Sequence, residues 1–184
     1  MCRAIDDAGD RWAASLRGRR WVDVSAAVVS NLSDHGAVWV LAAAVKGRRP
    51  GLARRRAIVA LALAGTTSYG VNRAVKQVVG RSRPEHAEVP TNGLPIRTPS
   101  SSSFPSGHTL AAFCAAVVLP DDRSARLAAL SFAAAVAASR VHLRTHHPSD
   151  VLGGAAIGAA LGTLVRPLVS VLAPRPGCGR GRPE

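Results

Sequence analysis

The feature that most constrains this fold is a series of apolar runs, rich in Ala, Val, Leu and Gly, that are separated by short polar or basic segments. The runs lie within residues 21–45, 57–80, 106–120, 124–141 and 150–174. Ala and Leu favour helices, and aromatic residues, which favour strands, make up only 4% of the chain. The pattern predicts an all-α protein of about five helices, and 47% hydrophobic residues suffice for one sizeable core.

The length of these runs bears on whether the helices cross a membrane. Residues 57–80 are long enough for a hydrocarbon core of about 30 Å, whereas several other runs fall short of the roughly 20 residues that a span needs. Hydropathy alone therefore fits both a membrane bundle and a soluble core. Basic residues at 46–56 and the four-residue spacing of Gly154, Gly158 and Gly162 favour the membrane. We expect an integral membrane helical bundle with about five transmembrane helices.

The charge and the cysteines exclude some classes of protein. A formal net charge of +13 attracts phosphate, but no aromatic and basic platform accompanies it, so we expect no nucleic acid partner. The three cysteines lack C-x-x-C spacing, which argues against a disulfide framework. The acidic start of the chain argues against a cleaved secretory signal. We expect a polar N-terminal segment over 1–20, a single domain over 21–173 and a basic C-terminal tail over 174–184.

Three polar clusters, at 76–84, 105–108 and 139–150, interrupt the apolar pattern. In a five-helix arrangement all three lie at helix ends on the same side, where ionisable groups are costly unless they are paired or used. Arginine suits bidentate contact with phosphate, and lysine suits a point contact. The clusters therefore predict an oxyanion pocket made by Lys76, Arg83 and Arg140. Taken singly, Lys76 and Arg83 also fit residues that snorkel to the membrane interface.

The sequence PSGH at 105–108 adds a turn before a predicted helix. Gly107 lets the backbone approach a ligand, and the free N–H groups of a helix start favour an anion. Ser106 adds a hydroxyl donor. His108 is placed to give a proton to a leaving group, although a helix cap is the plainer interpretation of this residue alone.

The third cluster contains His146 and Asp150, whose spacing brings their side chains together if the segment is helical. An aspartate on one ring nitrogen fixes the tautomer and frees the other nitrogen, so His146 could attack phosphorus. Taken alone, His146 is also consistent with an ordinary loop histidine. A metal site of His142, His146 and Asp150 is a further alternative, but Arg140 and Arg144 would repel a divalent cation and attract phosphate.

Together these residues resemble a known pattern. The stretches KQVVGRSRP, PSGH and SRVHLRTHHPSD, which lie between residues 76 and 150, resemble the three signature motifs of the type 2 phosphatidic acid phosphatase family, in the family's order and spacing. The resemblance implies His146 as a nucleophile that forms a phosphohistidine, Asp150 as its orienting partner and His108 as the acid. It implies phosphate binding by Lys76, Arg83, Ser106, Gly107 and Arg140, with no metal and no cofactor. His142, Arg144 and His147 lie outside the pattern, and we expect them to be solvated loop residues.

The resemblance also implies a function and a location. Integral members of this family act on lipid phosphates at the outer face of a helical bundle. We expect a membrane phosphatase whose partners are membrane lipids and a lipid phosphate or diphosphate substrate, such as a polyprenyl phosphate or diphosphate, phosphatidic acid or phosphatidylglycerol phosphate. Basic residues are divided almost evenly between the loops on the two sides of the expected membrane. Several of those on the side of the three motifs are explained by phosphate binding, so they do not indicate a cytoplasmic location. Without them, the basic segment at 46–56 is favoured as the cytoplasmic side.

Alternatives stay open at this point. One is a soluble acid phosphatase or an enzyme like the vanadium haloperoxidases, and the other is a non-catalytic membrane protein that binds phospholipid. The motifs do not determine the lipid head group, and the oligomeric state is unknown.

Overall fold

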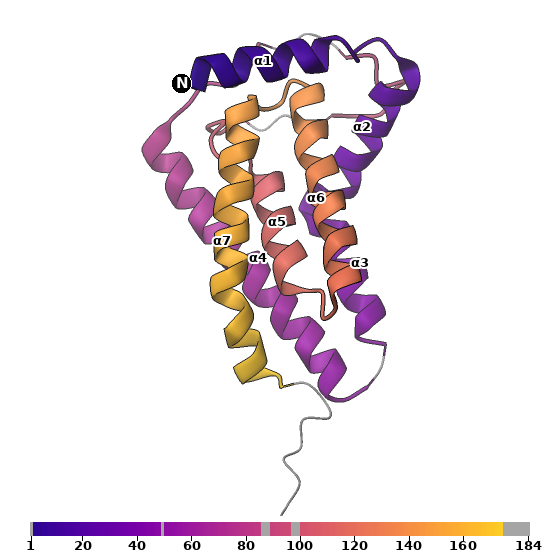
Figure 1. Ribbon diagram of the computed structural model, residues 1–184, viewed down its shortest axis with the longest axis vertical. Helices are drawn as coiled ribbons and strands as arrows, with labels where there is room; N and C mark the ends of the chain where they lie inside the picture. Colours follow the sequence, from indigo (N-terminus) through magenta and orange to yellow (C-terminus); the bar gives the residue numbers. More distant parts are fainter. Residues whose placement is uncertain (1, 49, 86–88, 97–99, 175–184) are drawn as a thin grey trace, which may run out of the picture.

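The computed structural model describes residues 2–48, 50–85, 89–96 and 100–174, and every regular element within them is helical (Figure 1). The predicted all-α class is therefore confirmed. The helices are α1 (Cys2–Ala14), α2 (Arg20–Leu32), α3 (Ala37–Lys46), α4 (Leu52–Val79), α5 (Gly107–Val118), α6 (Arg123–His142) and α7 (Pro148–Leu172), and a 3-10 turn at Asp34–Gly36 joins α2 to α3. Apart from Pro174, the expected C-terminal tail lies outside the described residues.

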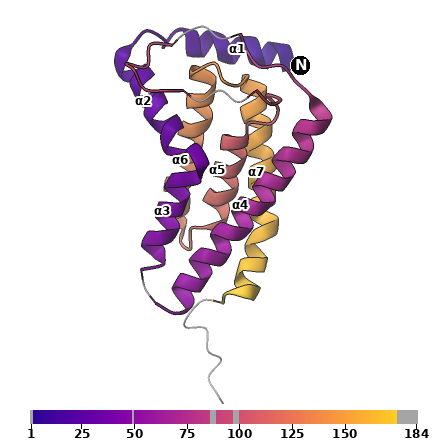
Figure 2. The ribbon, with the colours of Figure 1, turned by 180° about the vertical axis from the view of Figure 1, so that it is seen from behind.

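Helix α5 forms the centre of the bundle. Most of its residues are buried, and it packs chiefly against α7 and then against α6 and α4. In Figures 1 and 2 the longer helices surround α5, and α1 lies across one end of the bundle. The core is built mainly from Ala, Val and Leu of α3 to α7, with Trp39 against Phe132 as its aromatic contact. If α2 and α3 are counted together, the bundle has five helical segments, which correspond to the five expected helices.

Three glycines of α7 permit the close contact with α5. A Cβ atom on Gly158 would lie 2.3 Å from the carbonyl oxygen of Leu110, and one on Gly154 would lie 2.8 Å from the carbonyl oxygen of Ser106. At Gly162 a Cβ atom would be 2.7 Å from the side chain of Val117. No other residue fits these distances without separating the helices, so the predicted packing role of the glycine spacing is confirmed.

The apolar run over 21–45, where we expect an amphipathic lead-in and a first helix that ends near Val45, contains two helices, and the second ends at Lys46. Helices α2 and α3 are bent by 62° with respect to each other. Gly36 lies between them with a φ of 68°, a left-handed conformation that glycine adopts at little energetic cost. The chain turns here because Asp34–Gly36 form a 3-10 turn instead of continuing the α-helix.

Length and composition identify helices that can cross a membrane. Among the described residues, α6 and α7 are long and apolar enough, and the bent α2–α3 pair passes the same test as one broken span. Helix α4 has 28 residues but contains several charged side chains, and α5 has only 12 residues. Helix α1, which precedes the bundle in the chain, buries Ala13 and Asp6 and exposes Trp12.

Candidate active site

The three polar clusters meet at the end of the bundle that α1 covers, where α4 and α6 end and α5 and α7 begin (Figures 1 and 2). A cavity of about 420 Å³ lies at this end. Five of the predicted site residues line it: Lys76, Arg83, Gly107, His108 and His146. The remaining three, Ser106, Arg140 and Asp150, are fully buried. The topology therefore brings together residues that are up to 74 positions apart in the sequence.

Arg140 is a completely buried arginine with most of its donors unused. Its Nη1 donates a hydrogen bond to the hydroxyl of Ser30 in α2. Among the described residues, its Nε and Nη2 have no hydrogen-bond partner. A buried charge with open donors is unfavourable unless a ligand of opposite charge completes it, and a phosphoryl oxygen is well suited to that position.

Arg83 and Lys76 are held by the loop before α5, and Arg83 also by the turn between α6 and α7. Arg83 donates to the carbonyl oxygens of Thr145 at 2.7 Å and Ser101 at 3.0 Å, and Lys76 donates to the hydroxyl of Ser101 at 3.1 Å. The Nη1 atom of Arg83 is also 3.4 Å from Nε2 of His146. Two cationic groups are thus fixed at the wall of the cavity next to the histidine.

The contacts of His146 define which nitrogen is free. Its Nδ1 lies 2.8 Å from the carbonyl oxygen of Ser103, and because a carbonyl only accepts, Nδ1 carries the hydrogen. Nε2 therefore has the lone pair, on the side of Arg83. Burial is the main cause that lowers the pKa of His146 to about 4; Arg140 and Arg83 act in the same direction, and Asp150 opposes them. The imidazole is neutral at neutral pH, as a nucleophile requires.

Asp150 lies near His146 but has other partners as well. Its Oδ2 is 3.7 Å from Nδ1 of His146 and accepts a hydrogen bond of 2.8 Å from the backbone N–H of His147. Its Oδ1 accepts from Nη1 of Arg81 at 2.7 Å. The carbonyl of Ser103 is thus the closer partner of the imidazole, while Asp150 adds negative charge and anchors the start of α7.

The PSGH residues occupy the start of α5. Ser106 precedes the helix and its hydroxyl accepts a hydrogen bond from Thr109 at 3.0 Å, which leaves its own hydrogen available. A Cβ atom on Gly107 would come within 3.1 Å of the Asn72 side chain, so a larger residue here would require Asn72 to move. His108 points to Asp34 in the turn after α2, with 2.7 Å between Nε2 and Oδ1.

Some functional contacts were not foreseen. Asp34 holds His108, and Asp23 of α2 holds His142 with 2.7 Å between Oδ1 and Nε2. Both aspartates were visible as polar interruptions of the first apolar run, and that signal could have identified them. Arg81, two residues before Arg83, was also missed; it bridges Asp150 and Asp6 of α1.

The expectation that the three residues outside the motifs are solvated loop residues was wrong for His142. This side chain belongs to α6 and is 4% exposed. Its burial follows from the docking of α2 on α6, which brings Asp23 to the ring. His147 is half-buried at the start of α7, and Arg144 is half-buried with a φ of 54° in the turn before it.

The alternative metal set does not come together in the described part of the chain. His142 faces Asp23, whereas His146 faces Ser103 and Asp150. Within these residues no group of three His, Cys, Asp or Glu side chains is arranged to hold a metal ion.

Comparisons with known proteins give a family and several similar proteins. A sequence model described as the PAP2 superfamily matches residues 56–172. The chain is 36% identical over 142 residues to a decaprenylphosphoryl-5-phosphoribose phosphatase of Mycolicibacterium smegmatis, a match that covers 77% of this chain and 76% of the relative. It is 34% identical over 108 residues to phosphatidylglycerophosphatase B of Bacillus subtilis, covering 52% and 50% of the two chains.

A solved structure has the same fold. The crystal structure of a transmembrane PAP2 type phosphatidylglycerolphosphate phosphatase from Bacillus subtilis superposes with a TM-score of 0.73 at 25% sequence identity. The superposition covers 97% of this chain and 89% of that chain.

Proposed function

The chain belongs to the PAP2 superfamily and is a membrane phosphatase, and on this premise we propose that it removes a phosphate group from a lipid by attack of His146 on phosphorus. The observation that carries the proposal is the completely buried guanidinium of Arg140, whose Nε and Nη2 have no hydrogen-bond partner among the described residues, at the end of the bundle where His146 lines the cavity. Only an anion balances such a group, and the neighbouring histidine is neutral and has its Nε2 lone pair available.

We assign the binding of the phosphoryl oxygens to Arg140, Arg83 and Lys76. The hydroxyl of Ser106 and the backbone N–H of Gly107 complete the set at the start of α5. These donors are held by the protein before the substrate arrives, so little reorganisation is needed as negative charge develops on the equatorial oxygens. A chemistry based on these cations and His146 requires no metal ion.

The proposed reaction has two steps. In the first, the Nε2 lone pair of His146 forms a bond to phosphorus while the bond to the leaving oxygen breaks, and His108 gives that oxygen a proton. In the second, His108 takes a proton from water as the water oxygen bonds to phosphorus and the P–N bond breaks. The carbonyl of Ser103 and the carboxylate of Asp150 stabilise the imidazole ring as it becomes positive. Asp34 holds His108 in place.

The shape of the cavity supports a lipid substrate. Its wall follows α4 from Gly65 through Tyr69 to Lys76, a length of roughly 16 Å along the helix. Tyr69 is exposed, so the cavity extends from the charged end to the outer surface of the bundle. The relatives are named for substrates that carry phosphate on a lipid. The class that we propose first is a polyprenyl phosphate or a phosphosugar linked to a polyprenyl lipid. We also propose that the active site faces away from the cytoplasm.

The test is phosphate release by the purified protein in detergent, with a panel of decaprenyl phosphates, phosphatidic acid and phosphatidylglycerol phosphate, with and without a chelator. We expect activity in the chelator, and its loss by at least about a thousandfold in His146→Ala, because no other nucleophile takes part. His147→Ala, the matched neighbour, should retain most activity. Activity that survives in His146→Ala would contradict the assignment of the nucleophile, and loss in the chelator would contradict a metal-free reaction.

A further inference from the structure

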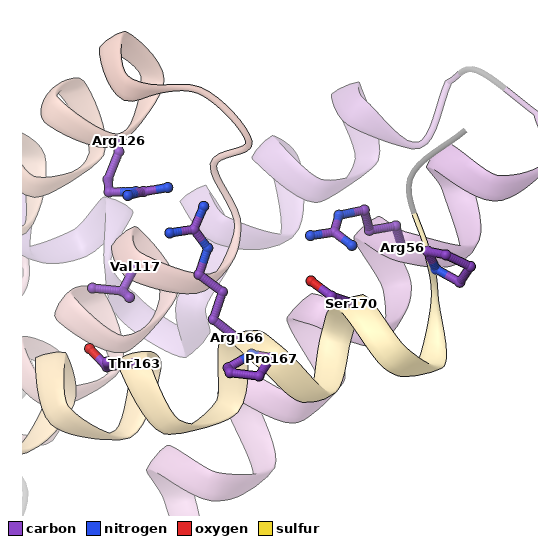
Figure 3. A pocket seen from close by; sticks show the side chains of 8 residues that line it. Arg56, Val117, Arg126, Thr163, Arg166, Pro167 and Ser170 are labelled. Carbon is purple, nitrogen blue, oxygen red and sulfur yellow. The ribbon is translucent and has the colours of Figure 1, made fainter. Parts of the chain in front are cut away.

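A second cavity lies at the end of the bundle opposite the candidate active site (Figure 3). Its volume is about 770 Å³, within the range of about 300–1,000 Å³ that is common for small-molecule sites. Helix α7 connects the two ends, and Arg166 lies roughly 24 Å along it from Asp150. The residues that line the cavity are Arg56, Val117, Arg126, Thr163, Arg166, Pro167, Ser170 and Pro174.

Three arginines converge on this cavity, one each from α4, α6 and α7. Figure 3 shows the guanidinium groups of Arg56, Arg126 and Arg166 around a common space. None of the described residues that line the cavity is acidic. Three guanidinium groups around one cavity give it a positive potential, which attracts an anion.

The individual contacts indicate where the anion would lie. Arg56 is fixed, because its Nη1 donates to the carbonyl oxygen of Ala173 at 2.8 Å and its Nε donates to Asp121 at 3.2 Å. The Nε of Arg126 is buried and has no hydrogen-bond partner among the described residues. The hydroxyl of Ser170 lies next to Arg56 at the edge of the cavity (Figure 3). Guanidinium and hydroxyl donors of this kind suit the oxygens of a phosphate group.

The surface next to the cavity is apolar. Leu164, Leu168 and Val171 of α7 are 71%, 51% and 77% exposed. These side chains follow the same helix that carries Arg166, and α7 is one of the helices able to cross a membrane. A ligand with a phosphate in the cavity and hydrocarbon chains along α7 would satisfy both features.

We propose that this cavity binds the phosphate head group of an anionic phospholipid from the leaflet opposite the active site. Its described lining contains no histidine, cysteine or carboxylate that could attack phosphorus or transfer a proton, so the lipid is bound there and not hydrolysed. The site holds the ends of α4, α6 and α7 together through one head group. Binding therefore stabilises this end of the bundle.

The experiment measures binding of phosphatidylglycerol to the purified full chain in a neutral detergent by native mass spectrometry, with thermal unfolding as a second readout. The test variant is Arg126→Gln combined with Arg166→Gln. The matched control is Arg123→Gln, an exposed arginine one turn away on α6 that does not line the cavity. We expect the double variant to bind one lipid fewer, or to bind it at least about tenfold more weakly, and to lose the rise in Tm that the lipid gives. Arg123→Gln should behave like the wild type.

A further measurement distinguishes binding of the lipid from binding of free phosphate. Inorganic phosphate at millimolar concentration should not reproduce the rise in Tm; an equal rise would show a site for free anions and overturn the lipid proposal. Unchanged lipid binding in the double variant would also overturn it. Phosphatase activity in detergent checks that each variant is folded, and Arg126→Gln alone replaces the double variant if that protein is inactive. The phosphatase assignment does not depend on any of these outcomes.

Discussion

Arg140 departs most from ordinary arginine behaviour, since its side chain is fully buried and only Nη1 has a partner among the described residues. Leaving part of a buried charge unpaired costs several kcal/mol in a folded protein. A bound phosphoryl group offsets that cost. The same residue therefore makes the empty protein less stable and the bound one more stable, which is the behaviour expected of a preorganised anion site.

The protonation of His146 gives a prediction at this scale. Because burial lowers the pKa of this group to about 4, its imidazole stays neutral and nucleophilic from neutral pH down to about pH 5. Protonation of the His146 ring should then lower the logarithm of kcat/KM only near pH 4, where His108, whose pKa burial also lowers to about 4, titrates as well. The second ionisation of a phosphate monoester lies near pH 6, so it is separable from this limb. An acidic limb near 6.5, the pKa of an ordinary histidine, would contradict the assigned environment.

The motifs predict which residues form the site, and the structure brings these residues together, but the motifs do not predict the partners of these residues. The spacing of Lys76, Arg83 and Arg140 was sufficient to predict cations at one end of the bundle. Ser30 and Asp34, which hold Arg140 and His108, are 110 and 74 residues away from them in sequence. Such distant pairs have no local pattern, because they depend on how the first helices dock. The carbonyl of Ser103 also has no sequence signal, since every residue has one.

Among the elements, α1 is the one least evident in the sequence. It is held to the segment after α4 and to the start of α7 by Asp6, which accepts hydrogen bonds from Arg81 at 2.6 Å and from the backbone N–H of Ser149 at 2.8 Å. Gly9 adds a close contact, since a Cβ atom there would lie 2.5 Å from Pro148. Burial alone raises the pKa of Asp6, but the hydrogen bonds from Ser149 and Arg81 outweigh it, so the pKa lies below its usual value.

We predict that Asp6→Asn lowers both stability and activity. The substitution removes the charged partner of Arg81, which also holds Asp150, and loss of such a hydrogen bond costs about 2 kcal/mol. A shift of the loop that carries His146 should lower kcat/KM by about tenfold. Asp7→Asn is the matched control, because Asp7 is exposed on the same helix. Thermal unfolding and phosphate release measure the two effects, and equal behaviour of both variants would show that α1 does not support the site.

The contact between α5 and α7 gives a prediction about packing. Gly158→Ala places a methyl group against the backbone of Leu110, which cannot rotate away, so we expect a loss of stability of about 1–3 kcal/mol. Gly70→Ala in α4 is the control, because no atom lies within 4 Å of its Cβ position and alanine favours helix by up to about 1 kcal/mol. Thermal unfolding in detergent should move in opposite directions for the two variants. A neutral Gly158→Ala would mean that the helices are not in close contact.

For the whole molecule, the series of apolar runs predicted the number of helical segments in the bundle, because the helix that each run forms must bury one face in the same core. The bend between α2 and α3 was not predictable from hydropathy, since Gly36 and its neighbours are a short interruption in a run that otherwise continues. Membrane orientation is the least determined property. Its sequence signal is the distribution of basic residues, which the chemistry of the active site obscures.

Orientation is therefore a prediction with its own measurement. In a background with Cys2 and Cys178 replaced by serine and the buried Cys114 retained, we place single cysteines at two exposed positions, Arg48→Cys and Glu85→Cys. If the active-site end faces outward, a membrane-impermeant maleimide labels the Glu85→Cys protein in intact cells, and the Arg48→Cys protein only after permeabilisation. The reverse result would place the active site on the cytoplasmic side.

The bent α2–α3 pair and its connecting turn also have a consequence for how the protein is made. Asp23, Ser30 and Asp34 are synthesised early, yet their partners His142, Arg140 and His108 follow 119, 110 and 74 residues later. A nascent chain must therefore carry three polar side chains in or beside its first hydrophobic segment before anything can neutralise them. Helices α2 and α3 therefore reach their final environment only after α5 and α6, which carry those partners, have been synthesised.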